Sequence, residues 1–168
     1  MAENNEKQSS YIDCGLASLI PGYAGYRAVN EIVEAGEKIR AYIASGIEEL
    51  VKSIDVKKLE AASNLSGMAA LPSLERAGAA LSRIADMLKY APAGTSSFNF
   101  SSSDTSMPLK IKSYDETLYF SFQEAKALVG ELAAKNEAAA SAALLLKITA
   151  WADAYMAKIK ARNELLKS

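Results

Sequence analysis

The stretch Val29–Ile54, VNEIVEAGEKIRAYIASGIEELVKSI, places an apolar residue at about every third or fourth position. Its large apolar members are Val29, Ile32, Val33, Ile39, Ile43, Ile47, Leu50, Val51 and Ile54. This spacing puts them along one stripe of an α-helix, and most charged residues fall off that stripe. Because no glycine or proline interrupts the pattern near Asp55, it predicts one helix from about residue 27 to 65. Gly67 is placed to end it.

A second helical stripe follows the dipeptide Pro72-Ser73, and Ser73 is predicted as its N-cap. The members of this stripe are Leu74, Ala77, Leu81, Ile84 and Leu88. Pro92 predicts its end, because the residue before a proline disfavours helical backbone. The short link from 66 to 73 predicts an antiparallel hairpin with the second half of the first helix.

The C-terminal third of the chain is also helical in pattern. Ser113 and Glu116 fit a capping box, with the serine at the N-cap and the glutamate three residues later. The apolar stripe after it is Leu118, Phe122, Ala125, Leu128, Val129 and Leu132, and a further stripe is Leu144, Ile148, Trp151, Tyr155 and Ile159. A bundle requires a turn near 134–140, whereas a single helix from 114 to 166 is the rival reading, and the sequence leaves both open.

Residues 92–112, PAGTSSFNFSSSDTSMPLKIK, are rich in serine and threonine and predict a long loop. Phe98 and Phe100 alternate with polar residues, as do Leu109 and Ile111, and this alternation is compatible with a small β-hairpin.

Together these patterns predict an all-α protein: an elongated antiparallel bundle of about four helices with one long loop. Residues 1–10 are predicted to be a disordered tail, and residues 11–168 a single helical-bundle domain. The glycines within the helical patterns are expected to let helices approach closely; they are Gly36, Gly46, Gly78 and Gly130.

The composition argues against catalysis. The 168 residues contain no histidine, which removes the Ser-His-Asp and Cys-His relays and every zinc site that uses histidine. Cys14 is the single cysteine and is expected to be a small buried residue. Glu31, Glu34 and Glu37 share a helix face that is expected to be solvated. We therefore predict no enzyme activity, no catalytic residue, no metal, no cofactor and no small-molecule substrate.

The net charge and the polar N-terminus exclude some classes of partner and some cellular locations. A formal net charge of -1 disfavours binding to nucleic acid, which needs clustered lysine and arginine. No apolar run approaches the roughly 18 residues that a membrane span needs, and residues 1–10 do not look like a signal peptide. These features predict a cytoplasmic protein.

Two aromatic segments are the candidate partner-binding elements. The segment Ser18–Arg27, SLIPGYAGYR, contains Tyr23 and Tyr26 just before the first helix. The 92–112 loop contains Phe98 and Phe100. In one reading these side chains pack onto the bundle. In the other they are exposed and bind a partner or a bilayer surface. For the Ser18–Arg27 segment, packing at the start of the fold is the favoured interpretation.

The chain resembles a family of uncharacterised helical proteins from bacteria and archaea that has no settled activity. The resemblance rests on Ile20–Tyr26, which reads I-P-G-Y-A-G-Y, and on Arg83–Ala91, which reads R-I-A-D-M-L-K-Y-A. It covers most of residues 18–167 and implies the helical fold.

The function predicted from the sequence is therefore that of a non-enzymatic helical interaction or scaffold protein. It binds a protein partner or associates with itself. The alternative is a peripheral membrane-associated protein that docks through Leu19–Tyr26 or through the Phe98/Phe100 loop.

Overall fold

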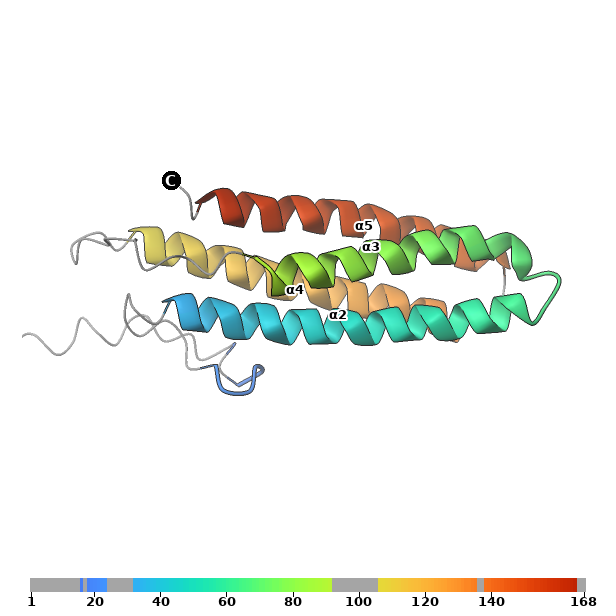
Figure 1. Ribbon diagram of the computed structural model, residues 1–168, viewed down its shortest axis with the longest axis horizontal. Helices are drawn as coiled ribbons and strands as arrows, with labels where there is room; N and C mark the ends of the chain where they lie inside the picture. The colour runs from blue at the N-terminus through green and yellow to red at the C-terminus, as the bar shows by residue number, and fades with distance from the viewer. Residues whose placement is uncertain (1–15, 17, 24–31, 92–105, 136–137, 166–168) are drawn as a thin grey trace, which may run out of the picture.

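A computed structural model describes residues 16, 18–23, 32–91, 106–135 and 138–165. Regular structure in these ranges is entirely helical, which confirms the all-α prediction (Figure 1). The elements are α2 (Ile32–Ala62), the 3-10 turn η3 (Met68–Ala70), α3 (Leu71–Lys89), α4 (Ser106–Ala134) and α5 (Ala138–Leu165). None of these helices is both long and apolar enough to cross a membrane.

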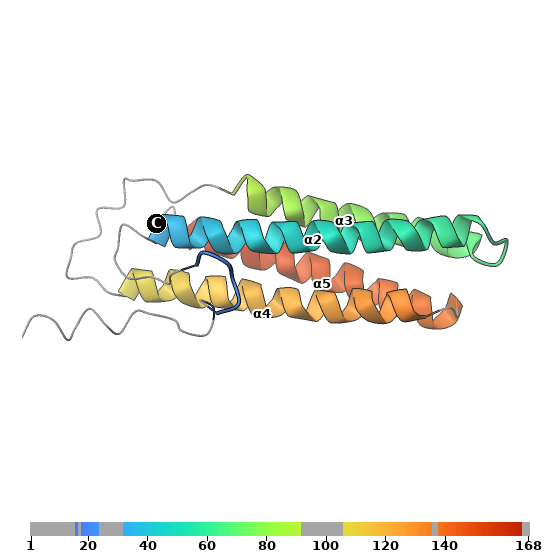
Figure 2. The same cartoon turned by 90° about the horizontal axis from the view of Figure 1, so that it is seen from below.

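The four long helices form two antiparallel hairpins, α2–α3 and α4–α5, that pack side by side (Figures 1 and 2). In cross-section α2 contacts α3 and α4, and α5 contacts the same two helices. Both hairpins turn at the same end, so α2 runs parallel to its neighbour α4, and α3 runs parallel to α5 (Figure 2). The bundle is thus antiparallel within each hairpin and parallel between the hairpins.

Helix α2 confirms the opening stripe over its described length. Ile39, Ile43, Ile47 and Ile54 are fully buried, and the helix passes Asp55 without interruption. It ends at Ala62, so the prediction that Gly67 ends it is wrong. Gly67 instead packs its bare Cα against the helix end, where an added Cβ would lie 2.8 Å from the carbonyl oxygen of Ala61.

The predicted cap of α3 is also wrong. The N-cap is Ala70, which makes no side-chain capping hydrogen bond, and Pro72 lies in the first turn. The reason is η3, whose backbone is already helical and runs directly into α3, so that Ser73 is inside the helix. The proline is tolerated because first-turn amides have no intrahelical acceptor.

Helix α4 begins at Ser106, seven residues before the predicted capping box, so the 92–112 loop is shorter than predicted. Ser113 lies inside the helix, where its carbonyl accepts a hydrogen bond from Thr117 Oγ1 at 2.8 Å. Ile111 is buried on the same face as Leu118, two turns away, and burial of Ile111 in the core favours extension of the helix backwards. A strand at Leu109–Ile111 is therefore excluded. The other half of the predicted hairpin, with Phe98 and Phe100, lies outside the described residues.

Two helices, not one, form the C-terminal third. Helix α4 ends at Ala134 and α5 begins at Ala138, where a bundle requires the turn. The α5 stripe is buried as predicted; its members are Leu144, Ile148, Trp151, Tyr155 and Ile159.

Candidate functional site

The N-terminal segment lies along the side of the bundle formed by α2 and α4 (Figure 2). Leu16, Ile20 and Tyr23 belong to the hydrophobic core, and Tyr23 is only 3 % exposed. Gly22 has a φ of 74°, a value that favours glycine, and it turns the chain so that both Ile20 and Tyr23 face inward. Leu19 is the exposed apolar residue of this segment. Of the candidate binding residues, Tyr26, Phe98 and Phe100 lie outside the described residues.

Three charged residues are buried together near the open end of the bundle. They are Arg40 on α2, Asp115 on α4 and Arg162 on α5, and none is more than 4 % exposed. Arg162 donates from Nε to Asp115 Oδ1 at 2.5 Å and from Nη2 to Asp115 Oδ2 at 3.4 Å. Gly36 makes room for the pair, because an added Cβ would lie 2.7 Å from Arg162 Nη2. This ion pair joins α4 to α5 beneath α2.

The sequence patterns did not single out these charges, although a signal exists. Asp115 lies three residues before Leu118 and seven before Phe122, and Arg162 lies seven after Tyr155. Both are therefore at apolar-stripe positions of their helices. A charged residue at such a position requires a buried partner of opposite charge.

Trp151 and Tyr155 are core residues whose polar atoms form buried hydrogen bonds. Trp151 Nε1 donates to the Ser121 carbonyl at 2.9 Å, and the Tyr155 hydroxyl donates to the Leu118 carbonyl at 3.0 Å. Their rings stack with centroids 4.6 Å apart. These contacts fasten α5 to α4, so both residues have the core role that the sequence predicts.

Burial raises the pKa of the Tyr155 hydroxyl well above its usual range, and the nearby Asp115 carboxylate adds to the shift. The folded protein therefore keeps this proton at a pH where the unfolded chain, with a tyrosine pKa of about 10, loses it. Stability should fall as pH rises above about 10, with Tyr155 contributing about 1.4 kcal/mol per pH unit. Urea unfolding at several pH values between about 9 and 11 measures this slope.

Tyr155→Phe should flatten the alkaline slope by that amount, because the titrating hydroxyl is gone. Tyr90→Phe is the matched control, since Tyr90 is exposed and its replacement should leave the slope unchanged. An unchanged slope in Tyr155→Phe would show that this hydroxyl titrates normally in the folded state.

The outer face of α5 is apolar although it faces solvent. The residues that form it are all exposed and recur at intervals of three or four; they are Ala143, Leu146, Ala150, Ala154, Ala157 and Ala161. Leu146 is 72 % exposed. Because the inner face of α5 is the core stripe, this helix is apolar on two opposite sides, and only the inner side is covered by described residues. We call the exposed set the α5 outer face.

The acidic residues of α2 do not assemble into a site. Glu34 is exposed and pairs with Lys38 at 2.8 Å, which lowers the pKa of the Glu34 carboxyl. Glu37 is exposed as well, and Glu31 lies outside the described residues. Within the described ranges, no group of three aspartate, glutamate or cysteine side chains is placed to hold a metal ion.

The fold and these surfaces define an all-α bundle with a buried ion pair and an apolar helix face that no described residue covers. Comparison of the chain with protein-family models, curated proteins and solved structures gives no match.

Proposed function

We propose that this protein is a non-enzymatic helical interaction protein that associates with itself through the α5 outer face. The observation that supports the proposal is the exposure of an apolar stripe that runs from Ala143 to Ala161. A helix that is apolar on two opposite sides has a second apolar face that burial would stabilise. The stripe is about 27 Å long at 1.5 Å per residue, enough to seat a helix of similar length.

The residue types favour a helix as the occupant. Alanine side chains let two helix axes approach to about 8 Å, the lower end of the usual range. A second copy offers the same face, and a two-fold axis makes one patch complementary to itself.

Charges on one flank of the stripe support an antiparallel pair. Asp153 and Lys160 are both exposed and lie on the same side of the stripe, seven residues apart. Neither forms an ion pair with another described residue. In a two-fold antiparallel pair centred between them, Asp153 of one copy would lie opposite Lys160 of the other, and the part of the stripe from Ala150 to Ala161 would be paired. Two symmetric ion pairs would then fix the register.

The expected result for wild type is a particle of about twice 17.9 kDa in size-exclusion chromatography with light scattering. Ala154→Glu should give a monomer, because it places two like charges in the interface without disturbing the core. Ala79→Glu, at an exposed position of α3, is the matched control and should remain a dimer. Circular dichroism should show the same helix content for all three proteins.

The flanking charges give a second test of the same prediction. Asp153→Lys should weaken the dimer by about tenfold, and adding Lys160→Asp should restore it, because the charges are exchanged across the two-fold axis. A wild-type chain that stays monomeric at about 100 μM would overturn the proposal.

We also propose that the protein is cytoplasmic and binds no nucleic acid. We further propose that it belongs to the prokaryotic family with the I-P-G-Y-x-G-Y segment. The membrane alternative is less favoured, because Ile20 and Tyr23 of its docking segment are core residues. Co-sedimentation with anionic vesicles is its test, and no binding is expected.

A further inference from the structure

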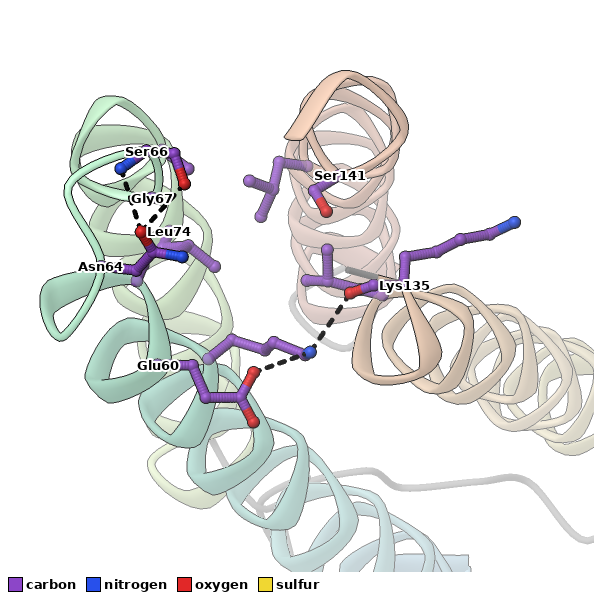
Figure 3. A pocket seen from close by; sticks show the side chains of 12 residues that line it. Glu60, Asn64, Ser66, Gly67, Leu74, Lys135 and Ser141 are labelled. Atoms are coloured by element: carbon purple, nitrogen blue, oxygen red, sulfur yellow. Dashed lines mark hydrogen bonds and ion pairs between the residues drawn. The ribbon is translucent and has the colours of Figure 1, made fainter. Parts of the chain in front are cut away.

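A pocket opens between the two hairpins at the end where both of them turn (Figure 3). Its volume is about 270 Å³. Its floor is formed by Leu74, Leu132 and Leu145, one residue from each of α3, α4 and α5, and all three are buried. Apolar cavities of about 150 Å³ accept a benzene ring, so this space suits an apolar body of about ten non-hydrogen atoms.

The mouth of the pocket is polar. Glu60 of α2 and the carbonyl of Lys135, just after α4, lie on opposite sides of the gap (Figure 3). The Lys57 ammonium bridges them, with Nζ 2.8 Å from Glu60 Oε2 and 3.2 Å from the Lys135 carbonyl oxygen. The Lys57 side chain is 13 % exposed and lines the pocket together with the three leucines.

The Lys57 ammonium has a donor to spare. An ammonium carries three N–H groups, and the described structure supplies Lys57 with two acceptors. The charged groups at the mouth are the Lys57 ammonium and the Glu60 carboxylate, because the Lys135 side chain extends away from the gap (Figure 3). The carboxylate of a ligand would accept a charge-assisted hydrogen bond from the third Lys57 N–H.

We propose that this pocket binds a small amphipathic carboxylate, with its carboxylate on Lys57 and its apolar chain on Leu74, Leu132 and Leu145. Octanoate has the required size and charge, and 1-octanol is its neutral counterpart. The proposal rests on the pocket alone and is independent of self-association, since the α5 outer face does not line it.

The test is a titration of the methyl-labelled protein with octanoate below its micellar concentration, followed by NMR. The methyl groups of Leu74, Leu132 and Leu145 should shift and saturate with a Kd on the order of 1 mM or tighter, as expected for a ligand of this size. The methyl groups of Leu88, a buried leucine at the opposite end of α3, should not move. Octanol should bind about tenfold more weakly.

Two lysine variants separate the ligand site from a general charge effect. Lys57→Met should weaken octanoate binding about tenfold and leave octanol binding unchanged. Lys58→Met removes the same charge at the next position, outside the pocket lining, and should bind octanoate as wild type does. Ala154→Glu should also bind octanoate normally.

Three results would overturn the proposal. They are an absence of saturable shifts at the floor leucines, equal shifts at Leu88, and equal octanoate affinity in Lys57→Met and Lys58→Met. The wild-type titration decides the first two even where loss of the Lys57 bridge destabilises the variant.

Discussion

Asp115→Ala is expected to destabilise the fold by about 3–5 kcal/mol, because it leaves the Arg162 guanidinium buried without its counter-charge. Asp115 is 0 % exposed and Arg162 2 % exposed, so water cannot replace the lost carboxylate unless the helices separate. Arg162 Nη1 already has no acceptor in the described structure, which makes the carboxylate the main compensation for this charge. Urea denaturation at neutral pH, followed by circular dichroism, measures the loss.

Glu116→Ala is the matched control, one residue further along α4. Its partner is Lys112 at 3.4 Å, and both side chains are about a quarter to a third exposed. A pair of this kind contributes about 0–1 kcal/mol, so the two neighbouring variants should differ severalfold in effect. Similar losses in both would show that Arg162 finds another acceptor or reaches water.

The double variant Asp115→Leu/Arg162→Met tests whether the penalty comes from the unpaired charge. Replacing both partners with apolar side chains removes the charge along with its partner, and such replacements are often neutral or stabilising. We therefore expect the double variant to be more stable than Asp115→Ala. A double variant as unstable as the single one would assign the loss to packing or to Arg40, which stays buried in the same cluster.

Gly46→Ala is expected to destabilise the protein by about 2 kcal/mol, although alanine is the better helix former. An added Cβ would overlap Cζ of Phe122, well inside contact distance. The Phe122 ring is buried at the α2–α4 interface and cannot move away without opening the core. Urea denaturation of the purified variant measures the change.

Gly130→Ala makes the same chemical change with the opposite expected sign. Gly130 is exposed, and nothing lies within 4 Å of an added Cβ, so its predicted role in close packing is wrong. Alanine there should stabilise α4 by about 0.5–1 kcal/mol through helix propensity. Phe122→Leu should partly rescue Gly46→Ala, with a coupling of at least about 1 kcal/mol, because the two residues are in contact. Equal stabilisation by both alanines would exclude the clash.

Helix boundaries show where local patterns are unreliable. Ser113, Asp115 and Glu116 match a local N-cap pattern, yet α4 starts at Ser106 and Asp115 is buried. A capping pattern indicates only that a helix can begin there. The helix extends backwards because Ile111 has core to pack against, and that core is built from other helices.

Local sequence patterns likewise predict one part of the candidate site and not the other. The sequence indicates that Trp151 and Tyr155 are core residues, because stripe periodicity is a local property. It does not pair Asp115 with Arg162, 47 residues away, and it does not reveal the pocket, whose floor comes from three helices.

The sequence by itself determined the helical class, the stripes and the hairpin turn near residue 66, because periodicity and turn-forming residues act over a few positions. It left open whether the chain turns near residue 136. Tertiary structure alone decided which hairpin faces meet. It placed α2 beside α4, buried the Arg162–Asp115 pair, gave Gly46 but not Gly130 a close neighbour, and left the α5 outer face uncovered by the described chain. Those outcomes depend on contacts between residues far apart in the chain, which a local pattern does not encode.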